Sequence, residues 1–207
     1  MDKFYKQNGY KKIIFNKKKN LSILKKKILN IFKTISIKKK SKIKINNHKD
    51  IINLYKKNKK IWVMAYDQIR NMPELYGLIF TSDFLKKISK VSGIKIPTLT
   101  TSKITIRLDM PNGQGSTLTK PHQDYVAHQG SSNSITVWIP LQDTLYKNGS
   151  LNIIKGSHKK GFVSDNLNWK TKKIPPNLIS KKKANTIGNF ENIETKFGEV
   201  LLFSTFL

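Results

Sequence analysis

Apolar positions in the first part of the chain recur with the spacing of helices. In "NLSILKKKILNIFKTI" they return every three or four residues, which predicts one amphipathic helix that begins after an N-cap at Asn20. Residues 50–70 and 82–91 repeat the helical pattern, whereas residues 10–15 predict a short strand. The apolar stripe of the first helix consists of Leu21, Leu24, Ile28, Ile31, Phe32 and Ile35. We expect this stripe to pack against a sheet, with a membrane surface or a partner helix as the alternative.

The pattern changes near residue 94 to that of strands. "IKIPTLTTSKITIRLDM", "SSNSITVWIPLQD", "LNIIKGSH" and "FGEVLLFSTFL" are β-branched or short apolar runs separated by Gly, Pro and Asn turns. Residues 164–189 form a polar excursion between the last two of these runs. Helices followed by strands predict an α+β fold with an antiparallel β core. We expect a single domain, with a mainly helical basic flank over 1–93 and the β core over 94–207.

Charge is concentrated in the N-terminal third. Residues 1–60 carry 21 Lys against Asp2 and Asp50, a net of +19 out of +28 for the whole chain. Arg70 and Arg107 are the only arginines, although proteins that read bases or clamp phosphates rely on Arg. Codon bias in an A/T-rich genome explains the abundance of Lys, so we do not expect nucleic acid as a partner. A Lys-rich protein that binds a polyanion stays as an alternative.

Composition also restricts the compartment. The chain has no cysteine, so disulfides and thiolate metal sites are excluded and a reducing compartment is favoured. Its apolar runs all fall short of the roughly 20 residues that a membrane helix needs. The sequence "MDKFYKQNGYKKIIF" lacks the continuous apolar segment of a secretory signal. We therefore expect a cytoplasmic protein without a membrane span, and the sequence does not indicate its oligomeric state.

The densest group of reactive side chains is "KPHQDYVAH". His122 and Asp124 are two residues apart, so in extended backbone both side chains project from one face and Gln123 projects from the other. An imidazole and a carboxylate on one face are two-thirds of the facial triad that binds non-haem Fe(II). An H-x-D tripeptide also arises by chance, so the spacing alone leaves a surface His beside an Asp as the plain alternative.

The order of motifs around this tripeptide resembles a known family. "HQDY", "SITVWIPLQD", "NGSLNIIKGSH" and "FGEVLLFSTFL" together are similar to the phytanoyl-CoA dioxygenase family of Fe(II)/2-oxoglutarate-dependent oxygenases, over roughly residues 100–207. The resemblance implies a double-stranded β-helix, a jelly-roll or cupin-like barrel flanked by N-terminal helices. It also implies Fe(II) as cofactor, 2-oxoglutarate as co-substrate and hydroxylation of a small organic substrate that the sequence does not identify.

The resemblance also implies roles for individual residues. His122 and Asp124 match the first two iron ligands, and no catalytic residue is implied beyond the metal ligands. Trp138 matches an aromatic residue that lines the 2-oxoglutarate pocket, and Thr136, which shares its strand face by the period of two, is expected to be a second lining residue. Arg107 either helps to hold a co-substrate carboxylate or is an outward-facing strand charge.

Two parts of the family pattern fall beyond Leu207. By the resemblance, the second iron-binding His would come about two residues later, and the Arg for the distal carboxylate of 2-oxoglutarate on the following strand. His128 and His158 would substitute only after a rearrangement of the chain. We therefore expect an incomplete oxygenase domain with its C-terminal strand or strands missing, and its final apolar strand as an unpaired edge. Whether it is active is left open, with an inactive copy of the fold as an alternative.

Overall fold

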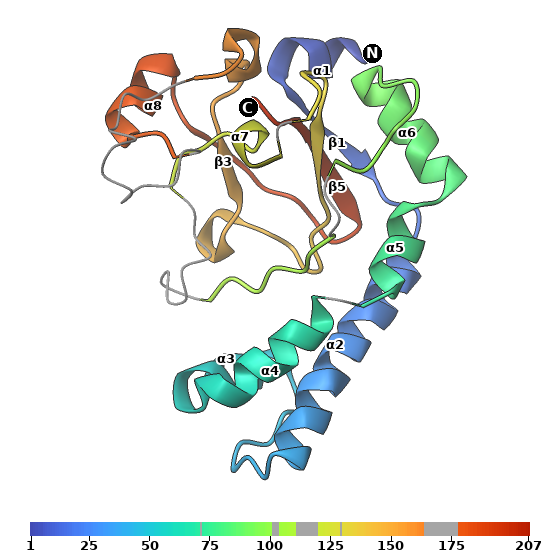
Figure 1. Ribbon diagram of the computed structural model, residues 1–207, viewed down its shortest axis with the longest axis vertical. Helices are drawn as coiled ribbons and strands as arrows, with labels where there is room; N and C mark the ends of the chain where they lie inside the picture. The colour runs from blue at the N-terminus through green and yellow to red at the C-terminus, as the bar shows by residue number, and fades with distance from the viewer. Residues whose placement is uncertain (71, 101–103, 111–119, 129, 164–177) are drawn as a thin grey trace. The chain divides into compact units, whose positions relative to one another are not determined.

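The computed structural model describes residues 1–207 except 71, 101–103, 111–119, 129 and 164–177. Contacts divide the chain into two compact units, which we describe separately (Figure 1). The sheet unit comprises Met1–Asn16, Thr81–Ser102 and Leu118–Leu207. The helical unit comprises Lys17–Phe80 and Lys103–Thr117.

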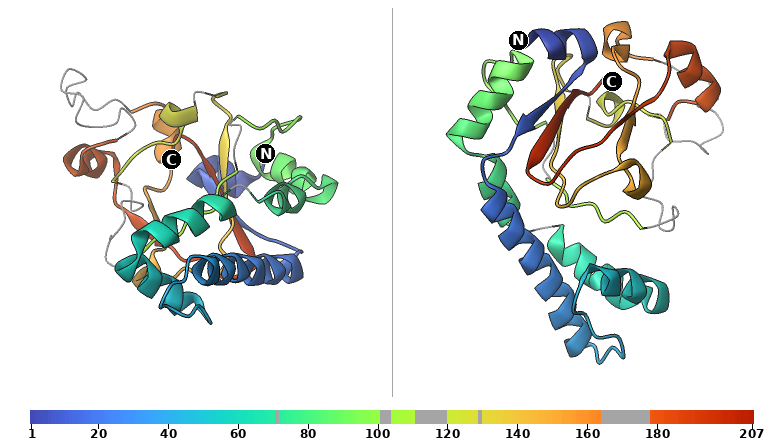
Figure 2. Two further views of the ribbon diagram at one scale, coloured as in Figure 1. Left: turned by 60° about the horizontal axis from the view of Figure 1, so that its bottom comes forward. Right: turned by 180° about the vertical axis from the view of Figure 1, so that it is seen from behind.

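The main sheet of the sheet unit is built around its C-terminal strand. β5 (Glu199–Ser204) lies between β1 (Tyr10–Ile14) and β2 (Ile135–Trp138), antiparallel to both (Figure 2). Its residues Val200, Leu201 and Leu202 are fully buried. The expectation that this strand would be an unpaired edge is therefore wrong, because the N-terminal strand occupies the position beside it.

A second, smaller sheet packs against the first. β3 (Leu151–Ile153) pairs with β4 (Glu191–Ile193) in antiparallel register. Ile153 and Ile193 form a buried cluster with Leu201 of β5, and Trp138 and Phe203 pack against this cluster. The four predicted strands at residues 10–14, 135–138, 151–153 and 199–204 are therefore confirmed. Two antiparallel sheets agree with the predicted α+β class, whereas a complete double-stranded β-helix stays a prediction.

The strand predicted within residues 94–110 is wrong. Residues 104–110 form no strand, and neither do residues 94–100. The carbonyl oxygen of Ile106 instead accepts a hydrogen bond from the Tyr66 hydroxyl at 3.1 Å. A β-branched run forms a strand only where another strand is available to pair with it. Here the side chain of Tyr66, from α4, donates a hydrogen bond to a backbone carbonyl that would otherwise bond to a neighbouring strand.

Short helices complete the sheet unit. α1 (Lys3–Asn8) precedes β1 and contacts α6 (Ser82–Ser92), and Phe84 of α6 makes an edge-to-face contact with Phe15, the residue after β1. α7 (Tyr125–His128) is a short helix that ends at His128. The other helices among the described residues of this unit are η2 (Tyr146–Asn148), η3 (Ser157–Lys160) and α8 (Lys181–Ile187). α8 lies in the predicted polar excursion, where the Ser180 side chain caps its first turn.

The helical unit is built on its longest helix. α2 (Lys18–Lys38) packs on α4 (Lys59–Ile69), and α4 also contacts α3 (His48–Lys57). α5 (Glu74–Ile79) follows α4. The predicted N-cap at Asn20 is wrong, since α2 begins at Lys18 without a side-chain cap. Within this unit a helix rather than a sheet covers the apolar stripe of α2, where the rings of Phe32 and Trp62 meet with 6.2 Å between centroids. None of the helices that the structure describes is long and apolar enough to span a membrane.

Gly9 joins α1 to β1 where three segments meet. It has a left-handed φ of +81°, and its carbonyl oxygen accepts a hydrogen bond from the Ser204 N–H at 2.8 Å. A side chain at this position would overlap the ring of His158 and come within 2.6 Å of Leu207 Cδ1. Glycine is therefore required both by the backbone conformation and by the space.

We predict that Gly9→Ala lowers the free energy of unfolding by roughly 2–4 kcal/mol, from left-handed strain plus overpacking. Gly149→Ala is the matched control, because Gly149 has a φ of +96° and no atom lies within 4 Å of the position that a Cβ would occupy there. The control should lose only about 1 kcal/mol, from the strain alone. Denaturant melts measure both losses, and equal losses would contradict the packing argument.

Candidate metal centre

The H-x-D tripeptide lies where the chain passes from a β-bridge into a helix. His122 forms an isolated antiparallel bridge with Leu178, and Pro121 O accepts a hydrogen bond from Ile179 N at 2.7 Å. Asp124 is in the turn that leads into α7, which begins at Tyr125. The backbone is therefore extended at His122, as the sequence predicted, and turns at Asp124.

The two side chains of the tripeptide meet. His122 Nε2 is 3.3 Å from Asp124 Oδ1, and each side chain is about three-quarters buried. On the other side of the ring, His122 Nδ1 is 2.8 Å from the carbonyl oxygen of Lys120. A carbonyl only accepts, so Nδ1 carries a proton and Nε2 is the nitrogen that can present a lone pair to a metal. A fixed second nitrogen of this kind is usual for histidines that bind metals.

The carboxylate of Asp124 is also held by a residue of the main sheet. The Thr136 hydroxyl donates a hydrogen bond to Asp124 Oδ2 at 2.7 Å. Thr136 is on β2, whose pairing with β5 fixes its place opposite Phe203. One carboxylate oxygen is therefore tied to the sheet, and the other is directed at His122. A ligating carboxylate that is itself hydrogen-bonded keeps its orientation.

The donor atoms fit a divalent cation. A lone pair on Nε2 and a carboxylate oxygen repel each other at 3.3 Å unless a positive charge lies with them. Two ligands about 2.1 Å from a cation and at right angles to each other are separated by about 3.0 Å. A proton on Nε2 would relieve the same repulsion.

Within the part of the chain that the structure describes, no group of three His, Cys, Asp or Glu residues could hold a metal.

Gln123, between the two candidate ligands, ties the tripeptide to the core. It is 3% exposed, and its side-chain nitrogen donates to Gly161 O at 2.9 Å and to Phe206 O at 2.7 Å. Its side-chain oxygen accepts from Val163 N at 2.8 Å. The predicted alternation directs Gln123 away from His122, but a lone Gln carries no signal for the three bonds that it makes.

The segment after β5 runs beside the tripeptide. Tyr125 N donates to Thr205 O at 3.0 Å, and the Tyr125 ring stacks on Phe206 with 4.2 Å between centroids. Thr205 N in turn donates to Ser134 O at 3.1 Å, next to β2. The end of the chain therefore connects the first turn of α7 to the strand that carries Thr136.

The structure brings three of the five predicted site residues together. His122, Asp124 and Thr136 are in contact, and Trp138 lies on the same face of β2 two residues further on, against the Ile153–Ile193–Leu201 cluster. Arg107 belongs to the helical unit, where its guanidinium is 3.1 Å from Asp109. A role for Arg107 in binding a co-substrate stays a prediction.

His158 contacts the backbone of α1 and lies in a turn that is bonded to the same helix. Its Nε2 is 3.2 Å from the carbonyl oxygen of Lys6, and its Nδ1 is buried without a hydrogen-bond partner. Burial lowers the pKa of His158 and Lys159 lowers it further, although the bond to the Lys6 carbonyl acts in the opposite direction. The turn that carries His158 is also held by a hydrogen bond from Gly156 N to Asn8 O at 2.9 Å. The turn therefore holds the end of α1 within the sheet unit.

Removing the Gln123 side chain should loosen the tripeptide. Gln123→Ala leaves the Val163 N–H and two carbonyl oxygens without a protein partner, which we expect to cost about 2–4 kcal/mol of unfolding free energy. Gln142→Ala, at an exposed position of the same unit, should change stability by less than about 0.5 kcal/mol. Chemical denaturation measures both, and a loss for Gln123→Ala no greater than for the control would show that these bonds contribute little.

His158 should make the sheet unit less stable in acid. Its folded pKa lies below the value of about 6.5 in the unfolded chain, so the unfolded state takes up the proton first as the pH falls. This contribution to stability is complete above about pH 6.5 and is lost progressively below it. We expect His158→Gln to flatten the dependence of unfolding free energy on pH between 7 and 5, and an unchanged slope would contradict the assignment.

Comparison with known proteins places the chain in a family. Residues 88–207, more than half of the chain, match the family model for phytanoyl-CoA dioxygenase (PhyH). A search of curated proteins gave no match. The matched region contains the tripeptide, Thr136 and Trp138, and the cupin-like fold of the family agrees with two antiparallel sheets packed together. The chain therefore belongs to the phytanoyl-CoA dioxygenase family.

Proposed function

We propose that this protein is an Fe(II)- and 2-oxoglutarate-dependent oxygenase that hydroxylates a small organic substrate, with His122 and Asp124 as metal ligands. The observation that carries the proposal is the 3.3 Å approach of His122 Nε2 to Asp124 Oδ1, in a chain of the phytanoyl-CoA dioxygenase family. When bound, Fe(II) and 2-oxoglutarate supply the activation of O2 that hydroxylation of a C–H bond requires.

The protein's own residues orient the ligands and shape the site. The Lys120 carbonyl holds the ring of His122 with Nε2 toward the metal position, and Thr136 holds Asp124 by one oxygen. Gln123 and Tyr125 fasten the same loop to the segment after β5. Trp138 provides an apolar wall on the Thr136 face of β2, and an apolar wall excludes water from the reacting centre.

A second candidate is a member of this fold that binds a metal weakly and does not turn over. It is favoured by the absence of a three-residue ligand group among the residues described. A cation held by two protein ligands has more positions filled by water and a smaller free energy of binding. Metal affinity and turnover therefore have to be measured separately.

The test combines metal binding with turnover. We expect Co(II), used as a spectroscopic substitute for Fe(II), to bind the wild type, and His122→Ala and Asp124→Asn each to weaken binding by roughly tenfold or more. His48→Ala, which changes an exposed His in the helical unit, is the control and should leave binding unchanged. Succinate released from 2-oxoglutarate in the presence of Fe(II) and O2 measures turnover, and the His122→Ala variant should release none.

The outcomes separate the two candidates. Metal binding that depends on His122 together with succinate release supports the oxygenase. Binding that depends on His122 without succinate release supports the second candidate. Equal Co(II) affinity in the wild type and both ligand variants would overturn the metal site itself.

A further inference from the structure

One face of α2 carries a stripe of lysine and isoleucine that its helical neighbours do not cover. Positions three or four residues apart lie along one face of a helix. The members of this stripe are all exposed and are Lys19, Ile23, Lys26, Asn30, Lys33 and Ile37. Ile23 is 46% exposed and Ile37 is 67% exposed. Lys recurs every seven residues along the stripe, which is about 10.5 Å of helix.

The charge of the stripe is not balanced within its own unit. α2 contains seven Lys and no acidic residue. Residues 17–80 and 103–117, which make up the unit, together carry 18 Lys and two Arg against four acidic residues, Asp50, Asp67, Glu74 and Asp109. Asp50 caps α3 through hydrogen bonds to the backbone, and Glu74 forms an ion pair with Lys27, outside the stripe. A strong positive field therefore lies over the exposed side of α2.

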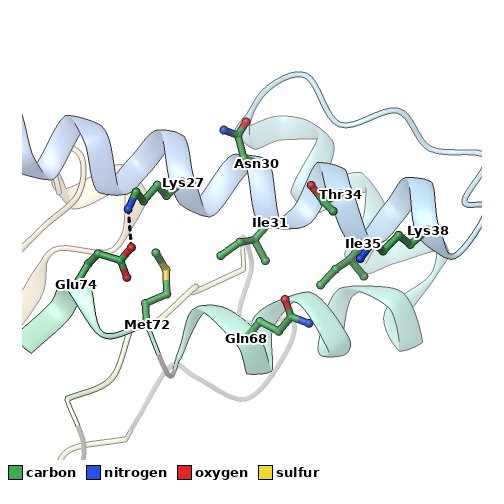
Figure 3. Close-up of a pocket in the computed structure, with 9 residues that line it drawn as sticks. All are labelled: Lys27, Asn30, Ile31, Thr34, Ile35, Lys38, Gln68, Met72 and Glu74. Atoms are coloured by element: carbon green, nitrogen blue, oxygen red, sulfur yellow. Dashed lines mark hydrogen bonds and ion pairs between the residues drawn. The ribbon is translucent and has the colours of Figure 1, made fainter.

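A groove beside the stripe has the same mixed chemistry. It lies between α2 and the end of α4 together with the start of α5, and its volume is about 400 Å³ (Figure 3). Ile31, Ile35 and Met72 line it, and Lys38 is at one end (Figure 3). Apolar and basic side chains of α2 therefore also occur together on the side of the helix that faces the groove, where Lys27 is paired with Glu74.

We propose that the α2 stripe binds the surface of a membrane that contains anionic lipids, with the helix lying in the plane of the interface. The Lys ammonium groups contact lipid phosphates and carboxylates, and Ile23 and Ile37 enter the boundary between headgroups and acyl chains. Lysine is suited to this position because its long stem lies along apolar surface while its charge stays in water. The inference is independent of the metal centre.

The apolar members of the stripe distinguish a lipid surface from a nucleic acid. Ile side chains gain free energy by leaving water for an acyl boundary, whereas they gain nothing beside a phosphate backbone. Nucleic-acid grooves are also contacted by Arg and by stacking aromatics, and the stripe contains neither. Charge attracts the helix to any polyanion, and exposed isoleucines favour the lipid.

The experiment is sedimentation of the full chain with vesicles of phosphatidylcholine, with and without about 30% phosphatidylserine. We expect binding only to the vesicles that contain phosphatidylserine, and weaker binding as salt rises. Lys26→Glu/Lys33→Glu should weaken it by roughly tenfold or more, since each basic residue near an anionic surface contributes about fivefold. Lys181→Glu/Lys182→Glu on α8 has the same change in net charge at exposed positions, and should weaken binding less than about threefold.

A second pair of substitutions tests the apolar contribution. Ile23→Gln/Ile37→Gln preserves charge and helix propensity at exposed positions, and should weaken vesicle binding by roughly tenfold. Circular dichroism checks that α2 stays folded in every variant. Failure of the wild type to bind, equal losses for the two Lys pairs, or no loss for the Ile pair would each overturn the proposal. Binding of a single-stranded oligonucleotide that the Ile pair leaves unchanged, without vesicle binding, would assign the stripe to nucleic acid instead.

Discussion

The pairing of β5 on both sides is the constraint on which the sheet unit depends. Its three consecutive buried residues, Val200, Leu201 and Leu202, supply apolar groups to both faces of the sheet. Leu201 joins the main sheet to the smaller one through Ile153 and Ile193. The residues that follow β5 then bond to the H-x-D loop and to the start of β2. The candidate metal centre is thus positioned by a strand that contributes no ligand to it.

The two candidate ligands are held by different kinds of hydrogen bond. Asp124 is tied to β2 through Thr136, so the register of the main sheet determines where its other oxygen, Oδ1, points. His122 is oriented by a carbonyl only two residues away, in its own loop. Gln123 connects this loop to two other segments and makes the loop part of the core. The geometry of the pair therefore follows from the core and not from the tripeptide alone.

The sequence predicted those features that depend on neighbours along the chain. Period-two alternation placed His122 with Asp124 and Thr136 with Trp138, and short apolar runs located four of the strands. Features that depend on distant segments were not predictable in this way. The run at 104–110 has the residues of a strand, but the Tyr66 hydroxyl donates a hydrogen bond to one of its carbonyl oxygens. The final strand was expected at an edge because nothing in "YKKII" indicates that it would pair with residues 199–203. Gln123 is a further case, since its three partners come from residues 161, 163 and 206.

The β1–β5 pair has a consequence for the order in which the protein is made and folds. The register joins Tyr10 to Phe203, so β1 leaves the ribosome long before its partner strand is synthesised. The helices of residues 17–80 make local contacts and can form meanwhile, whereas the main sheet has to wait for β5 to be synthesised. During that interval the apolar side of β1 is available to any other unpaired strand. The sheet unit should therefore be the slow step of folding, and the stage at which a chaperone would matter most.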